Sequence, residues 1–158
     1  AFKGGRRVEN SRSRAVDIPA DTGCIGCSVE KILCFFQMNG VVGEDTLFEL
    51  KVILNELVVN AVIHGNREDK NKRVWIKAGL CEDDKLYIIV EDEGEGSTWS
   101  EGPCYIVKNN QKKEGQKEEV EWVYLNESGR GLLIISSLCD YVKRNGNKVM
   151  VVKKLKQQ

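Results

Sequence analysis

Residues 49–65 read ELKVILNELVVNAVIHG, and the spacing of their apolar side chains indicates how the chain folds. The apolar positions recur at steps of three and four residues, which is the period of a helix with one face in a core. Gly65 and Asn66 predict the end of this helix, because both residue types accept the left-handed conformation common at helix ends. We therefore predict a long amphipathic helix over residues 44–64.

Three polar residues, Glu56, Asn60 and His64, follow one another at four-residue steps beside the apolar face. This spacing places them one helical turn apart along a single stripe. Polar groups next to a core are costly unless they have partners. The stripe therefore marks either a solvated edge of the helix or one wall of a binding site.

The composition predicts one soluble domain. The chain has 158 residues, and 24 basic residues balance 24 acidic ones, so we expect a single core and no direct binding to nucleic acid or to a membrane. The apolar runs are far shorter than the roughly 20 residues of a membrane-spanning helix, and the first residues lack an apolar signal segment. We expect a cytoplasmic protein with a flexible basic arm at residues 1–14 and one domain at residues 15–158.

Most of the six cysteines are expected to be reduced thiols in or near the core, because a domain of this size does not depend on disulfides. Cys24 and Cys27 have the spacing of a metal or redox pair. A closed zinc site needs four ligands, and His64 is the only histidine in the chain. The pair alone therefore gives little support to a metal site.

The segments around the long helix predict a two-layer α+β fold. We expect an edge strand at residues 15–19, a helix at 28–38 that Asn39-Gly40 ends, strands at 74–80 and 85–91, a helix from 129, and a closing hairpin around Asn145-Gly146. Residues 85–91 lack alternation, which is typical of a central strand. This order, with helices grouped between paired strands, favours a mixed, mostly antiparallel sheet that has the helices on one face.

Residues 97–128 are strongly charged and show no steady period. A segment of this length without regular structure is usually a functional lid or disorder. We therefore predict a lid at about residues 97–128.

An acidic turn with two glycines, Asp92-Glu93-Gly94-Glu95-Gly96, follows the predicted central strand. The glycines allow sharp bends and a close approach to the backbone. An aspartate carboxylate only accepts hydrogen bonds, so in a pocket it would favour the exocyclic amine of adenine and repel the keto oxygen of guanine. The turn is therefore either a base-binding site at Asp92 or a plain surface turn.

A second glycine pair, Gly129-Arg130-Gly131, leads directly into an apolar helix. The free N–H groups and the dipole at a helix start attract phosphate, and Arg130 can add a charge-assisted contact. The alternative is that Arg130 is an exposed hinge residue.

In this order, residues 55–65, 92–96 and 129–132 resemble the Bergerat-fold ATP-binding domains of gyrase, heat-shock chaperones, histidine kinases and mismatch-repair proteins. Within that family the chain is most similar to the anti-sigma factor serine kinases of bacteria. The likeness extends from about Asp17 to Leu155. It implies the fold of that family and two cofactors, ATP and Mg2+.

The resemblance also implies residue roles. Asn60 would bind the Mg2+ that bridges the triphosphate, and Glu56 would be the general base that takes the proton from a hydroxyl or water. Asp92 would bind adenine. His64 would end the helix near the pocket. Gly94 and Gly96 would shape the adenine pocket. Gly129 and Gly131 would let the end of the lid wrap the phosphates.

The chain departs from the family at two places. Asn147 stands where the family tends to have a threonine near adenine, and Asn147 could still donate a hydrogen bond there. The lid at residues 97–128 is long for an anti-sigma kinase.

Three functional hypotheses follow from the resemblance. The leading one is an ATP- and Mg2+-dependent serine/threonine-protein kinase that phosphorylates an anti-anti-sigma-type partner, with a sigma factor as a further partner and a homodimer as a compatible assembly. The second is a nucleotide-gated module that sequesters a sigma factor or another regulator without phosphotransfer. The third is a degenerate fold that binds no nucleotide.

Overall fold

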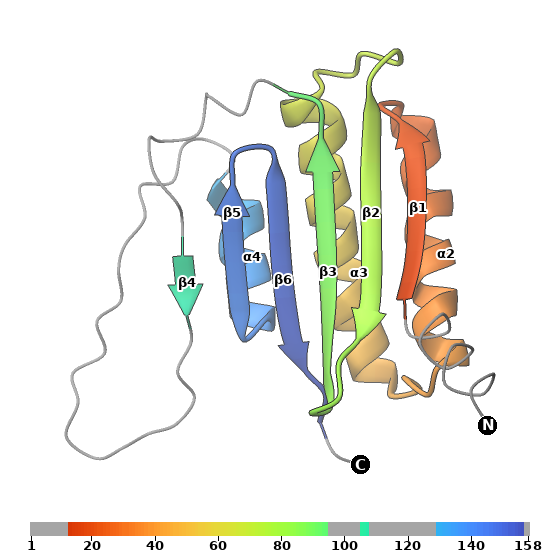
Figure 1. Ribbon diagram of the computed structural model, residues 1–158, viewed down its shortest axis with the longest axis vertical. Coiled ribbons are helices and arrows are strands. Elements are labelled where there is room, and N and C mark those ends of the chain that lie inside the picture. Colours follow the sequence, from red (N-terminus) through yellow and green to blue (C-terminus); the bar gives the residue numbers. More distant parts are fainter. Residues whose placement is uncertain (1–12, 95–104, 108–128, 157–158) are drawn as a thin grey trace, which may run out of the picture.

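Six strands form one sheet in the computed structural model, which describes residues 13–94, 105–107 and 129–156 (Figure 1). The strands lie in the order β1-β2-β3-β6-β5-β4, and each neighbouring pair is antiparallel. This arrangement confirms the predicted α+β class and the mostly antiparallel sheet. The elements in chain order are β1 (Ser13–Pro19), η1 (Thr22–Cys24), α2 (Ile25–Met38), α3 (Glu44–Val59), η2 (Asn60–Gly65), β2 (Arg73–Leu80), β3 (Lys85–Asp92), β4 (Tyr105–Val107), α4 (Gly129–Leu138), β5 (Tyr141–Asn145) and β6 (Lys148–Lys154).

The three α-helices α2, α3 and α4 all lie on one face of the sheet (Figure 1). The apolar stripe of α3 is fully buried at Leu50, Ile53 and Leu54, and the sheet contributes Ile76 and Ile88 to the same core. Burying each such side chain stabilises the fold by about 1.5–3 kcal/mol relative to leaving it in water. Among the described residues, no helix has both the length and the apolar character needed to cross a membrane.

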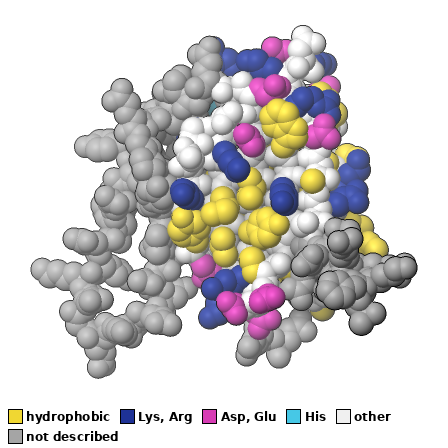
Figure 2. All heavy atoms as spheres, viewed as in Figure 1, with side chains coloured by type: hydrophobic (Ala, Val, Ile, Leu, Met, Phe, Trp, Pro, Cys, Tyr) yellow, Lys and Arg dark blue, Asp and Glu magenta, His cyan; other side chains and the backbone are white. Residues whose placement is uncertain are grey.

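In the described part of the chain the opposite face of the sheet carries no helix, and Figure 2 shows apolar side chains gathered at its centre with lysines and arginines among them. The alternating burial of β3 reflects this asymmetry, because Leu86, Ile88 and Val90 are buried whereas Tyr87 and Ile89 are half-buried. The prediction that residues 85–91 form a central strand is confirmed, because β2 and β6 pair with β3 on either side.

Local side-chain chemistry sets the bounds of α2. The helix was predicted from residue 28 and begins at Ile25, after the short 3₁₀ turn η1, whose preceding residue Asp21 accepts a hydrogen bond from the Gly23 N–H at 2.9 Å. At the other end, the Asn39 side chain donates to the Phe35 carbonyl, and Gly40 has a φ of +98°. The predicted stop at Asn39-Gly40 is confirmed.

The closing hairpin is confirmed as β5 and β6, with Gly146 at a φ of +60° in the turn. The strand β4 was not predicted, because its residues lie within the proposed lid. It pairs with β5 at the edge of the sheet. The rest of the proposed lid and residues 1–12 of the proposed arm lie outside the described residues. The predicted edge strand is confirmed as β1.

The cysteines differ from expectation in their burial. All five in the described part of the chain are free thiols, but only Cys139 is buried, while Cys27, Cys34 and Cys81 are exposed. The prediction that most cysteines lie in or near the core is therefore wrong for these three. They occupy outward-facing helix or turn positions that apolar periodicity does not distinguish. The described residues also contain no cluster of histidine, cysteine and acidic side chains suited to a metal ion.

Candidate functional site

The long helix changes character at Asn60. The prediction was one regular helix over residues 44–64, whereas α3 is α-helical to Val59 and continues as the π-helical turn η2. The Asn60 N–H still bonds to the Glu56 carbonyl, so these two residues are one turn apart as predicted. Further on, the Asn66 N–H reaches back five residues to the Ala61 carbonyl at 2.8 Å. Such wide turns occur mostly as single insertions and are frequent at functional sites.

Glu56 and Asn60 are the two polar residues of the long helix that were predicted to serve the site. Both are half-buried, and within the described part of the chain neither side chain forms a hydrogen bond or an ion pair. Another asparagine of the same helix, Asn55, instead donates its side-chain amide to the Lys51 carbonyl. A half-buried carboxylate and a half-buried amide, both without partners among the described residues, therefore lie one turn apart where α3 passes into η2.

The Asp92 carboxylate lies directly against the end of this helix. A methyl group added to Gly65 would overlap the carboxylate and lie only 2.7 Å even from its farther oxygen, Oδ1. A methyl group on Gly94 would lie 2.8 Å from the same Oδ1 and would overlap the Gly65 carbonyl oxygen. The two glycines thus allow η2, the end of β3 and the following turn to meet around one acidic side chain.

Burial sets the ionisation behaviour of Asp92. Removal from water raises the pKa of the Asp92 carboxyl above its ordinary value of 3.8, and the hydrogen bond from the Gly94 N–H to Oδ1, 2.8 Å long, only partly offsets this effect. The folded protein therefore favours the protonated carboxyl relative to the unfolded chain. The carboxylate exists at neutral pH at a cost to stability.

This cost predicts a pH dependence that Asp92→Asn removes. Because the folded-state pKa is raised, the folded protein binds more protons than the unfolded chain between pH 3.8 and the raised pKa, so this group's contribution to the free energy of unfolding falls as pH rises through that window. The stability of Asp92→Asn relative to wild type should rise across the same window and then level off. Urea unfolding of both proteins from about pH 3 to about pH 7 measures this difference, and a difference that is flat or falls with pH would contradict the prediction.

Asn147 holds the backbone of Asp92. The Asn147 side-chain N–H donates to the Asp92 carbonyl oxygen, and the Asp92 N–H donates to the Asn147 carbonyl at 3.0 Å. The Asn147 side-chain amide, predicted to reach adenine, therefore uses one of its two N–H groups on the strand that carries Asp92. Asn147 lies at the site, next to Asp92, in a role that the sequence did not indicate.

The remaining predicted residues are placed in part. Gly129, Arg130 and Gly131 form the first turn of α4, as predicted for a phosphate-binding helix start, but the Arg130 side chain lies outside the description. Gly96 also lies outside the described residues. His64 is exposed in η2, close to the helix end as predicted.

The sequence missed Asn66 as a structural part of the site. It was predicted to end the helix in a left-handed conformation, but its φ is −87°, and the positive φ values fall on Arg67 and Glu68 instead. Asn66 is completely buried, and its side chain bonds to the first residue of β2 and to the residue that follows β3. An asparagine after a helix is so often a cap that its sequence context gave no signal of these longer-range contacts.

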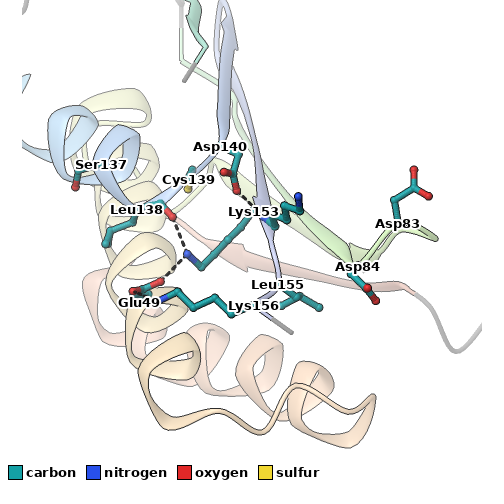
Figure 3. A pocket seen from close by; sticks show the side chains of 11 residues that line it. Glu49, Asp83, Asp84, Ser137, Leu138, Cys139, Asp140, Lys153, Leu155 and Lys156 are labelled. Atoms are coloured by element: carbon teal, nitrogen blue, oxygen red, sulfur yellow. Dashed lines mark hydrogen bonds and ion pairs between the residues drawn. The ribbon is translucent and has the colours of Figure 1, made fainter. Parts of the chain in front are cut away.

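A cavity of about 800 Å³ lies at the other end of the sheet, near the C-terminal end of β6 (Figure 3). Its deepest charged group is the Lys153 ammonium, which donates to the Leu138 carbonyl at the end of α4 and pairs with Glu49 of α3 at 2.5 Å. The Lys153 side chain is only 8% exposed. This cluster connects β6, α3 and α4, and it is separate from the residues around Asp92.

Breaking this pair is expected to destabilise the fold. Glu49→Gln removes the negative charge that compensates the buried Lys153 ammonium, so the free energy of unfolding should fall by about 3 kcal/mol. Replacing both residues, Glu49→Leu with Lys153→Met, should cost less than Glu49→Gln alone, because no unpaired charge remains. Urea unfolding of the variants measures both effects.

The matched control is Glu30→Gln, which breaks the exposed Glu30–Lys51 pair of 3.4 Å. Exposed pairs contribute little, so this variant should lose less than about 1 kcal/mol. Equal losses for Glu49→Gln and Glu30→Gln would show that burial of Lys153 does not determine the energy of its ion pair.

Comparison with known proteins connects this geometry to a family. Residues 28–153 match the histidine kinase-like ATPase domain, a segment that includes α3, η2, Asp92 and Asn147. The chain therefore belongs to the histidine kinase-like ATPase domain family.

Its relatives include bacterial regulators of sigma factors by name. The chain is 35% identical over 102 residues to an anti-sigma F factor of Shouchella clausii, covering 63% of this chain and 60% of that protein. It is 30% identical over 119 residues to an anti-sigma F factor of Clostridium perfringens, covering 70% of this chain and 74% of that protein. It is 34% identical over 100 residues to the serine-protein kinase RsbW of Bacillus subtilis, covering 63% of this chain and 57% of that protein. The resemblance inferred from the motifs is thus confirmed.

Proposed function

We propose that this protein is an ATP- and Mg2+-dependent serine/threonine kinase that phosphorylates a partner protein controlling a sigma factor. The observation that carries the proposal is the meeting of Gly65, Asp92 and Gly94 at the end of the helix that presents Glu56 and Asn60. We propose that the nucleotide base binds to the half-buried Asp92 carboxylate at this place. Two polar side chains without partners among the described residues lie along the same helix.

Each proposed role follows from the chemistry of its residue. The Asp92 carboxylate would accept a hydrogen bond from the exocyclic amine of adenine. Glu56 would accept the proton of the substrate hydroxyl as its oxygen attacks the terminal phosphate, which is the role of a general base. The first turn of α4 would offer backbone N–H groups to the phosphates.

Asn60 fits the requirements of a magnesium ligand. Its amide oxygen is hard and half-exposed, and no described residue bonds to this side chain. Mg2+ in nucleotide sites typically takes few protein ligands and completes its shell with phosphate oxygens and water. When bound, the ion would neutralise charge on the transferring phosphate.

The proposed partner and setting come from the relatives. Proteins named anti-sigma F factor and a serine-protein kinase are similar to this chain, which spans only about three fifths of the Shouchella clausii relative. We propose an anti-anti-sigma-type protein as the phosphorylated substrate and a sigma factor as a second partner. We also propose the cytoplasm as the setting, because such a kinase consumes ATP and acts on regulators of transcription.

Two measurements test this function in sequence. Thermal unfolding with Mg-ATP, Mg-GTP and each nucleotide without Mg2+ should show an upward shift that is largest for Mg-ATP, because ligands that bind only the folded state stabilise it. Incubation with γ-labelled ATP and candidate anti-anti-sigma proteins should then transfer label to serine or threonine. The absence of any nucleotide-dependent shift would overturn the proposal at its first step.

The alternative function is nucleotide-gated binding without catalysis. The anti-sigma F factors among the relatives are named for opposing a sigma factor, which a binding module can do by sequestration. In that case Mg-ATP would raise the melting temperature and increase sigma factor binding, but every partner would remain unlabelled.

A further inference from the structure

We propose that Asn66 is a positioning residue that holds Asp92 in the geometry needed to select adenine. The inference rests on the proposed ATP-binding function and adds a residue that contacts neither the base nor the phosphates. It begins from the contacts of one fully buried side chain at the end of η2.

Every polar group of Asn66 is engaged. Its side-chain N–H donates to the Arg73 carbonyl at 2.8 Å, and its side-chain oxygen accepts from the Glu93 N–H at 2.8 Å. Its backbone N–H donates to Ala61, and its backbone carbonyl accepts from the Asp69 N–H at 3.0 Å. The side chain therefore joins the end of η2 to the start of β2 and to the residue that follows Asp92.

Only an amide satisfies both side-chain contacts at this position. Asparagine offers a donor and an acceptor on one short branch, whereas aspartate offers acceptors alone when ionised and leucine offers neither. In a fully buried position, a lost partner leaves a backbone carbonyl or N–H without a hydrogen bond. The chemistry of the side chain is thus matched to the Arg73 carbonyl and the Glu93 N–H.

These contacts fix Asp92 from the side that faces the helix. Asn147 holds the N–H and carbonyl of Asp92 from β6, while Asn66 holds the next N–H along the chain, that of Glu93. Asn66 is also covalently adjacent to Gly65, which lies against the carboxylate. Gly65 therefore contacts Asp92, and its neighbour Asn66 bonds to Glu93, the neighbour of Asp92. These two contacts together set the distance between the Asp92 carboxylate and the end of η2.

A parallel link keeps the strands together when Asn66 is changed. The Glu93 carboxylate accepts a hydrogen bond from the Arg73 N–H, and the Arg73 guanidinium pairs with Asp17 of β1. These bonds attach Glu93 to β2 and β2 to β1 without involving the helix. Loss of the Asn66 contacts should therefore release the end of η2 from Asp92 while the sheet stays intact.

The test compares ATP with purine riboside triphosphate, which lacks only the exocyclic amine that Asp92 is proposed to bind. Wild type should bind ATP at least about tenfold more tightly, as expected for a hydrogen bond to a charged group. In Asn66→Asp and in Asn66→Ala this preference should fall close to unity, mainly through weaker ATP binding. Isothermal titration calorimetry with Mg2+ gives both dissociation constants for each protein.

Asn71→Asp is the matched control, because Asn71 is an exposed asparagine in the same loop. It should retain the wild-type preference for ATP. If Asn66→Asp and Asn66→Ala keep that preference, or lose affinity for both nucleotides equally, the positioning role is overturned. If wild type binds neither nucleotide, the proposed function itself fails.

A measurement on wild type covers the case in which the Asn66 variants do not fold. The Glu93 amide proton, bonded to a buried side chain, should exchange with solvent as slowly as the amides inside β3, both with and without Mg-ATP. Fast exchange of the Glu93 amide in folded wild type would show that the Asn66 contact is not maintained and would overturn the proposal.

Discussion

Glu56→Gln is expected to slow phosphotransfer from ATP to the partner protein by about 10²- to 10⁴-fold, the usual contribution of a positioned general base. Glutamine keeps the size of the side chain but cannot take the proton of the attacking hydroxyl. The Glu56 side chain bonds to none of the described residues, so its replacement should leave the fold intact. The dissociation constant for Mg-ATP should stay near the wild-type value, because the carboxylate acts in the transition state rather than in nucleotide binding.

Rapid-quench assays with saturating Mg-ATP measure this rate for Glu56→Gln, and Glu30→Gln is the control. Glu30 undergoes the same change of charge on the exposed side of α2 and should leave the rate unchanged. Two outcomes would count against the assignment of Glu56. One is a wild-type rate in Glu56→Gln, and the other is an equal loss of rate in both variants.

The sequence predicted the elements of the fold well because most of them follow local rules. The apolar spacing of α3, the Asn39-Gly40 stop and the turn at Asn145-Gly146 each depend on residues within a few positions. The strand β4 did not follow such a rule, since three residues are too few to show a period. Its pairing with β5, more than thirty positions later in the chain, makes it a strand.

The candidate site was predictable in its residue types but not in its contacts. Asp92, Asn60 and Glu56 stood out because their positions next to an apolar strand or helix need explanation. Gly65 and Asn66 are required by their contacts with residues 92 and 93. No local sequence pattern reveals a contact between residues so far apart in the chain. The π-helical turn at Asn60 was equally hidden, because the apolar periodicity continues through it.

On the face of the sheet opposite the helices, contacts between strands were also not predictable from the sequence. Tyr87 lies against Gly79, where an added methyl group would be 2.6 Å from the tyrosine ring, so this side chain packs along the sheet. The apolar run predicted a central strand, but periodicity alone did not show which of its side chains face the helices.

Gly65→Ala is expected to abolish the stabilisation of the protein by Mg-ATP. The added methyl group would overlap the Asp92 carboxylate, which cannot turn away without losing its bond from the Gly94 N–H. Overpacking of this kind costs about 1–3 kcal/mol of folding stability. The displaced carboxylate would also no longer lie where the adenine amine is proposed to bind. Urea unfolding and thermal unfolding with Mg-ATP measure the two effects separately.

Two further variants distinguish the loss of the site from a general loss of stability. Gly26→Ala adds the same methyl group in α2, where no atom lies within 4 Å, and should stabilise the protein by up to about 1 kcal/mol without changing ATP binding. Adding Asp92→Ala to Gly65→Ala removes the overlap, so folding stability should recover while the response to Mg-ATP stays absent. If the double variant regains ATP binding, or if Gly65→Ala never loses it, the nucleotide base does not rest on Asp92. The close approach of Gly65 to Asp92 would then be a packing contact alone.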